Sequence, residues 1–211
     1  MTLYNNKYRI ESARLAGYDY GSNGAYHITI CTKDRLHHFG EIVETDINPS
    51  ARQNASPFEE NVPLFGGVPP KTDRNPLDKT DRKPLDKTDR NPSLRFTLIA
   101  EIAAEHWLRI PQFFPFVSLD SFVIMPNHLH GILFINKQEN EEWKQNKFGS
   151  QSQNIPSIIR GFKSSVKRYA NAENIPFEWQ ERYHDRIIRD NKELENIRLY
   201  IFNNPQNWIN D

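Results

Sequence analysis

The chain has 211 residues and a formal net charge of zero; 37% of its residues are hydrophobic and 14 are prolines. This length suffices for one domain with a substantial core, and the low apolar content indicates a folded part diluted by a polar, proline-rich segment. A single cysteine excludes an internal disulfide. No apolar run is long enough to cross a bilayer, and residues 1–11 lack the apolar core of a secretory signal. We therefore expect a cytoplasmic protein without membrane contact.

The first predicted elements are a strand and a long insertion. Residues 25–32 alternate and are rich in β-branched side chains, which favours a strand. Residues 44–92 contain many prolines and a tandem repeat, in which KTDRNPLD at 71–78 recurs as KTDRKPLD at 79–86 and begins again at Lys87. We therefore predict one domain over 1–211, interrupted by a flexible surface insertion that loops away from the sheet face carrying His128 and His130.

The later elements complete a recognisable order. Met125-Pro126-Asn127 forms the turn of an expected antiparallel hairpin. The other predicted elements are a helix over 94–108, strands over 117–124 and 129–135, a helix over 155–170, a strand over 185–188, and a helix over 191–203 ended by Pro205. This order predicts an α+β fold: a ferredoxin-like split β-α-β antiparallel sheet with helices on one face, plus a C-terminal helix.

His128 and His130 stand two apart in a run that otherwise resembles a buried strand. Successive strand side chains point to opposite faces, so both imidazoles share one face. Neutral imidazole is the commonest protein ligand for divalent metals. The alternative is a structural pair or a half-exposed strand face.

Basic residues gather in the second half of the chain, although the net charge is zero. They are Arg160, Lys163, Lys167 and Arg168 on the helix over 155–170, followed by Arg182. Helical spacing groups several of them on one side, where they could bind a nucleic acid backbone. A solvated helix face explains the same pattern.

Tyr200 and Asn204 stand four apart and therefore project from one side of the last helix, beside its apolar stripe. A tyrosine can be a covalent nucleophile, and a carboxamide oxygen can bind Mg²⁺. Tyr200 could equally be a packing residue, and Asn204 a residue of the helix end.

Taken together, several blocks resemble the single-tyrosine HUH transposases, and within them the REP-associated tyrosine transposase group. The two most specific blocks are Met-Pro-Asn-His-Leu-His at 125–130 and Tyr-Ile-Phe-Asn-Asn-Pro at 200–205. The others are RLAGYDY at 14–20, AYHITICT at 25–32, RGFK at 160–163, WQ at 179–180 and YHDRIIRD at 183–190. The resemblance covers nearly the whole chain outside 44–92, where the family usually has a short connection.

The resemblance implies cleavage and rejoining of single-stranded DNA near hairpins of repeat-type palindromes, through a covalent 5′-phosphotyrosine. It implies that Tyr200 is the nucleophile and that His128, His130 and Asn204 bind Mg²⁺ or Mn²⁺, with Asn203 as the competing third ligand. Two nitrogen ligands suit Mn²⁺ better. The family also allows a homodimer. Two other functions stay open: a hairpin DNA- or RNA-binding module without cleavage, and a metal-dependent hydrolase of another kind.

Overall fold

The structure is a computed structural model and describes residues 3–4, 7–8, 18–45, 65–66, 91–138 and 152–208. Most of the insertion predicted at 44–92, with the repeat at 71–90, lies outside the described residues. Its predicted flexibility therefore stays a prediction.

Four strands form the central antiparallel sheet, in the spatial order β7, β8, β3, β9. They are β3 (Gly24–Cys31), β7 (Val117–Met125), β8 (His128–Ile135) and β9 (His184–Ile188). Met125 pairs with His128 across the turn, which confirms the predicted hairpin. This strand order is that of a ferredoxin-like split β-α-β sheet, so the predicted fold class is confirmed.

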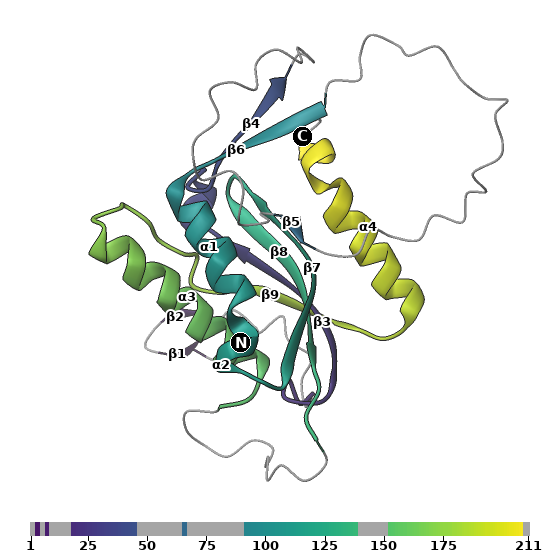
Figure 1. The fold of residues 1–211 in the computed structure, drawn as a ribbon. Helices are drawn as coiled ribbons and strands as arrows, with labels where there is room; N and C mark the ends of the chain where they lie inside the picture. The colour runs from purple at the N-terminus through teal and green to yellow at the C-terminus, as the bar shows by residue number, and fades with distance from the viewer. Residues whose placement is uncertain are drawn as a thin grey trace, which may run out of the picture.

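The larger core lies on the sheet face that two antiparallel helices cover, α1 (Leu98–Leu108) and α3 (Ile155–Ala172) (Figure 1). The four-residue helix α2 (Ile110–Phe113) follows α1. Both long helices bury apolar residues at helical spacing, and α3 carries a regular stripe of them. These buried residues of α3 are Ile155, Ile158, Ile159, Phe162, Val166 and Ala170.

The contact between α1 and the sheet is close enough to require a glycine. Trp107 of α1 is fully buried and lies over β8 at Gly131. A Cβ atom on Gly131 would lie 2.3 Å from Cζ2 of Trp107. Alternation along β8 places Gly131 and Leu133 on this face, and therefore His128 and His130 on the other.

The helix α4 (Asn191–Trp208) crosses the opposite face of the sheet (Figure 1). Asp190 accepts a hydrogen bond from the backbone amide of Glu193 at 2.7 Å, as residues preceding a helix commonly do. Ile197 and Ile201 pack on the sheet in a second, smaller apolar cluster. This cluster holds α4 against the face that carries the histidines.

The prediction that Pro205 ends the last helix is wrong, because α4 continues to Trp208. A proline inside a helix removes one backbone hydrogen bond. The additional turn brings the Trp208 ring to 5.8 Å from the His128 ring, between centroids, and against the apolar cluster under α4. Partial burial of the indole favours this additional turn.

The two ends of the insertion pair with each other. β4 (Gly40–Thr45) and β6 (Asn91–Phe96) form an antiparallel pair, so the helix predicted over 94–108 begins only at Leu98. Helical spacing alone did not show that residues 94–96 belong to a strand and not to the first turn of the helix.

Short segments complete the description. β5 (Phe65–Gly66), which lies within the insertion, pairs with β7 at the edge of the sheet, a contact that we did not predict from the sequence. β1 (Leu3–Tyr4) pairs with β2 (Lys7–Tyr8), and a turn of 3₁₀ helix, η1 (Lys33–Arg35), follows β3.

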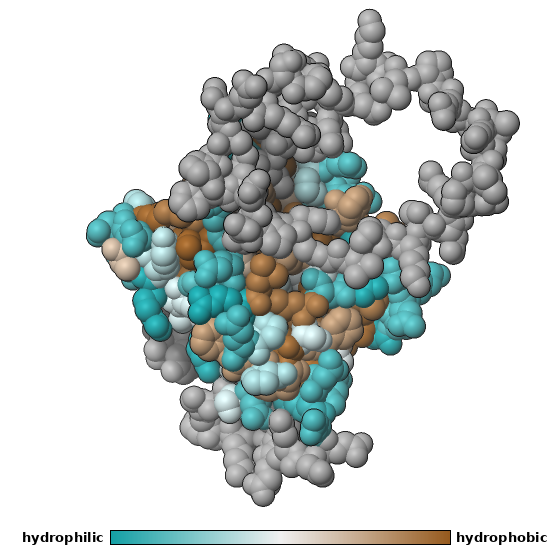
Figure 2. All heavy atoms as spheres, viewed as in Figure 1, coloured by the Kyte–Doolittle hydropathy of each residue, from teal (hydrophilic) through white to brown (hydrophobic). Residues whose placement is uncertain are grey.

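The helices in the described part of the chain are too short or too polar to cross a membrane. Hydrophilic residues with scattered apolar ones cover the flank on which α4 lies (Figure 2). Leu199 and Phe202 of α4 are 39% and 43% exposed, so the outer side of this helix is a solvent surface.

Candidate active site

β8 places His128 and His130 side by side under α4. Their ring centroids lie 4.5 Å apart, and the residues are only 7% and 5% exposed. Burial lowers the pKa of His128 to about 4 and, together with the charges around it, that of His130 to about 2. Both imidazoles are therefore neutral at neutral pH, which is the form that binds a metal.

Hydrogen bonds of the inner ring nitrogens orient both imidazoles. Nδ1 of His128 lies 2.7 Å from Oδ1 of Asn127, and Nδ1 of His130 lies 2.8 Å from the hydroxyl of Thr29. Because an amide oxygen only accepts, the network assigns the proton of His128 to Nδ1. The lone pair of its Nε2 is then free, as in metal-binding histidines whose other nitrogen is held by a neighbouring group.

The tyrosine predicted from the sequence reaches the same place. The Tyr200 hydroxyl lies 3.3 Å from Nε2 of His130, and the two rings are 5.1 Å apart between centroids. Tyr200 stands beside the anchors Ile197 and Ile201 and is 46% exposed. One chain thus brings together a strand histidine and a helix tyrosine that are 70 residues apart.

Asn204 comes to the same hollow, and Asn203 does not. A hollow of about 420 Å³ lies between β3, β8 and the second half of α4, and we call it the histidine hollow. Its lining residues are Thr29, Arg35, His128, His130, Tyr200, Asn204, Asn207 and Trp208. Asn204 is 7% exposed, whereas Asn203 is not among the lining residues. The geometry favours Asn204 as the third polar residue of the site.

A second hollow, of about 630 Å³, lies on the other side of Tyr200. It is bordered by β3, β9 and the first half of α4, and includes His27, Arg186 and Arg189. Tyr200 and His130 line both hollows. A chain-like ligand could therefore occupy space on both sides of the tyrosine.

His27 is a site residue that we did not predict. Its ring stacks on His130 at 5.3 Å between centroids, and its Nε2 atom is buried with no hydrogen-bond partner. Burial, aided by the charge of Arg186, lowers its pKa to about 4. Alternation along the first strand could have placed His27 and Thr29 on one face, but only the pairing of β3 with β8 shows that this is the histidine face.

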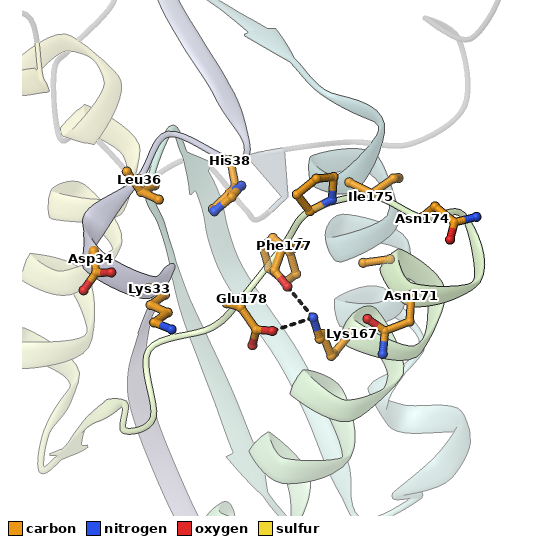
Figure 3. A pocket seen from close by; sticks show the side chains of 12 residues that line it. Lys33, Asp34, Leu36, His38, Lys167, Asn171, Asn174, Ile175, Phe177 and Glu178 are labelled. Carbon is orange, nitrogen blue, oxygen red and sulfur yellow. Dashed lines mark hydrogen bonds and ion pairs between the residues drawn. The ribbon is translucent and has the colours of Figure 1, made fainter.

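Of the predicted DNA-binding residues, those of α3 lie on the opposite face of the sheet from the histidines. Lys167 lines a different hollow there and donates to the backbone oxygen of Phe177 and to Glu178, both at 2.7 Å (Figure 3). Lys163 donates to the backbone oxygens of Gln180 and Glu181. These two lysines hold the segment that leads to β9, and they do not meet Tyr200.

The remaining predicted basic residues are all exposed. They are Arg160, Arg168 and Arg182. Arg160 and Arg168 lie on α3, and Arg182 lies in the connection to β9. The sequence pattern correctly placed the α3 residues on a helix, but it could not show which face of the sheet that helix covers.

A charged pair fixes α4 on the opposite flank from Tyr200. Arg198 donates from Nε to Oδ1 of Asp120 at 2.9 Å and from Nη2 to Oδ2 at 2.5 Å, and it also contacts Glu195. The Arg198 and Asp120 side chains are 20% and 12% exposed. Apolar contacts do not fix the orientation of a helix. A bidentate ion pair does, so the pair of Arg198 and Asp120 sets the rotation of α4 on the sheet.

The donor set fits a divalent cation of moderate softness. The described residues contain no group of three or more His, Cys, Asp or Glu placed to hold a metal. The set would therefore be Nε2 of His128, Nε2 of His130 and the amide oxygen of Asn204. Two imidazoles and an oxygen donor suit Mn²⁺ better than Mg²⁺.

Comparisons with known proteins complete the description of the site. No family model matches the chain. A solved structure of a REP-associated tyrosine transposase bound to a REP hairpin aligns over 94% of this chain and 74% of its own, with 13% identity and a TM-score of 0.46, a value that by itself decides neither fold nor function. A protein of Haemophilus influenzae described as uncharacterized is 32% identical over 209 residues, which are 95% of this chain and 90% of that protein. The chain belongs to the same family as this Haemophilus influenzae protein.

Proposed function

We propose that the protein cleaves and rejoins single-stranded DNA near hairpins through a covalent bond between Tyr200 and a 5′-phosphate. The observation that carries this proposal is the 3.3 Å approach of the Tyr200 hydroxyl to Nε2 of His130, beside a second neutral imidazole. The resemblance of the blocks at 125–130 and 200–205 to REP-associated tyrosine transposases supports the choice of substrate.

Each site residue would have a defined task. His128, His130 and Asn204 would hold Mn²⁺ or Mg²⁺. Such a cation, when bound, draws charge from a phosphate oxygen and so favours attack at phosphorus. Asn127 and Thr29 keep the two imidazoles oriented for this task.

The step at Tyr200 exchanges one phosphate ester for another. The phenol oxygen forms a bond to phosphorus, and the bond from phosphorus to the 3′-oxygen breaks. The 3′-oxygen takes up a proton, and the phenol loses one. Nε2 of His130 cannot hold a cation and accept this proton together, so the proton passes to water, which reaches the half-exposed tyrosine.

The space around Tyr200 supports a polymeric substrate. Hollows on both sides of Tyr200 leave room for the nucleotides that flank a scissile phosphate. The ester is conserved in the exchange, so rejoining needs no nucleotide cofactor. One chain supplies every named residue, and a second cleavage would need a second copy or a sequential reaction.

A labelled hairpin tests the proposal directly. We expect that the protein, Mn²⁺ and a hairpin with a single-stranded flank labelled at its 3′ end give a labelled band of higher mass on a denaturing gel. The same hairpin labelled at its 5′ end should give only a shorter free fragment. Chelation of the metal should abolish both products.

Matched variants decide which residue forms the bond. Tyr200→Phe should remove the adduct, whereas Tyr169→Phe, on α3 across the sheet, should keep it. Tight hairpin binding without any adduct, over several hairpins and both metals, would contradict cleavage and favour the binding module instead.

A further inference from the structure

The loop that follows β3 forms one wall of the histidine hollow. Arg35 of η1 lines the hollow together with His128, Tyr200 and Asn204. The neighbouring His37 ring lies 5.6 Å from that of Trp208, between centroids, so the loop also contacts the end of α4. Arg35 is exposed and thus open to a ligand in the hollow.

The backbone of this loop is held in an uncommon conformation. Asp34 and Arg35 have φ angles of 53° and 56°, and neither is a glycine. The left-handed region costs a residue with a side chain about 1–2 kcal/mol. Two such residues in succession indicate that the surrounding structure fixes the loop, which is typical of functional segments.

The buried Thr32 is what fixes the loop. Its hydroxyl, on a residue with no exposed surface, lies 2.7 Å from the backbone oxygen of Leu36 and 3.0 Å from that of Asn127. The backbone amides of Thr32 and Phe39 donate to Asn127 and Pro126. The loop is thereby attached to the turn that precedes His128, so the backbones of Arg35 and His128 keep a fixed relation.

Among the described residues, no neighbouring acid neutralises the charge of Arg35. No carboxylate in the described part of the chain lies within ion-pair distance of it, and the lining of the histidine hollow includes no acidic residue. The guanidinium lines the same hollow as His128, so its positive charge acts on the site. A permanent cation here favours an anionic ligand.

We propose that Arg35 binds a phosphodiester oxygen of the single strand that lies in the histidine hollow, and so positions the strand against Tyr200. The inference rests on the proposed function, because it specifies where that substrate is held. A planar guanidinium matches the spacing of phosphate oxygens, and its charge does not vary over the working pH range.

Salt dependence of binding tests this contact without any cleavage. In a Tyr200→Phe background, the affinity for a fluorescent hairpin with a thymidine tail is measured over a range of salt concentrations. Loss of one phosphate contact on a single strand reduces the slope of log affinity against log salt by about 0.7. We expect this reduction in Arg35→Ala, with an affinity roughly tenfold lower at low salt.

Three further variants sharpen the test. Arg35→Gln should behave as Arg35→Ala, and Arg35→Lys should keep the slope because it keeps the charge. Arg109→Ala, an exposed arginine at the end of α1, is the charge-matched control and should leave the slope unchanged. An unchanged slope in both Arg35→Ala and Arg35→Gln, or an equal reduction in Arg109→Ala, would overturn the inference.

The adduct assay separates this inference from the proposed function. If the wild-type protein forms no adduct but the slope still falls in Arg35→Ala, the phosphate contact stands and cleavage fails. If the adduct forms and the slope does not change, only the contact of Arg35 fails.

Discussion

The two faces of the central sheet are built for different purposes. The face under α1 and α3 is covered by large, fully buried side chains such as Tyr26, Trp107 and Leu133. In the described part of the chain, the cluster between the other face and α4 has only six buried apolar residues, two of them on α4, and three imidazoles stand beside them. Stability is concentrated on one face, which leaves the other free to bury polar groups that chemistry requires.

The attachment of α4 reflects this division. The small apolar cluster does little to fix the orientation of α4. The ion pair between Arg198 and Asp120 fixes it. Tyr200 lies on the flank of α4 opposite Arg198. The comparison of the two faces therefore predicts that changes on the first face affect stability, whereas changes at the site affect chemistry.

The largest effect on stability is expected from Leu133→Ala. Leu133 has no exposed surface, and its truncation leaves a cavity in the larger core, which typically costs about 2–5 kcal/mol. Urea denaturation would measure this loss. Leu199→Ala, on the exposed side of α4, is the control and should cost no more than about 0.5 kcal/mol. Equal losses for the two variants would show that the faces are not distinguished in this way.

An intermediate effect is expected from Arg198→Met, because it removes hydrogen bonds to a charged group and leaves Asp120 without them. We expect a loss of about 2 kcal/mol at neutral pH. Arg182→Met changes an exposed arginine and should be nearly neutral. If Arg198→Met were as stable as the wild-type protein, the pair would not be what holds α4.

The same pair predicts a dependence on pH. Burial alone would raise the pKa of Asp120, but hydrogen bonds from Arg198 and from the Ser121 amide outweigh it and hold this pKa below its usual value. The stabilisation is therefore complete above the usual carboxyl pKa of about 4, and it is lost as the pH falls below that value. The difference in unfolding free energy between wild-type protein and Arg198→Met should shrink accordingly between neutral pH and about pH 3. A difference that stays constant over this range would contradict the assignment.

The smallest effect on stability is expected from Tyr200→Phe. The residue is 46% exposed, and its hydroxyl makes one long contact at 3.3 Å. Thermal or urea unfolding should change by no more than about 0.5 kcal/mol, although the covalent adduct should disappear. A large loss of stability would mean that the Tyr200 hydroxyl is mainly a structural hydrogen-bonding group.

The sequence predicted the placement of the four candidate side chains better than it predicted the boundaries of the elements. Alternation was enough to place His128 and His130 on one face, and a separation of four was enough to place Tyr200 and Asn204 together on α4. Neither pattern depends on the rest of the chain. The prediction for Pro205 was wrong because the packing of Trp208, further along α4, outweighed the local rule that a proline ends a helix.

Residues that depend on pairing between distant segments could not be predicted. His27 becomes part of the site only because β3 pairs with β8, and Arg35 only because its loop is bonded to the turn at Asn127. The lysines of α3 show the same limit, since a helical pattern does not say which face of a sheet the helix covers.

The pairing of β4 with β6 has a consequence for engineering. Thr45 and Asn91 are partners across this pair, so the intervening chain leaves and re-enters the fold at one place. The entropy cost of closing a loop grows only with the logarithm of its length. Residues 46–90 can therefore be exchanged for another segment. Their replacement by a two-residue turn, or by a folded reporter domain, should leave the sheet face that carries His128 and His130 unaltered. Among the described residues, the sheet contact given up would be that of β5 with β7.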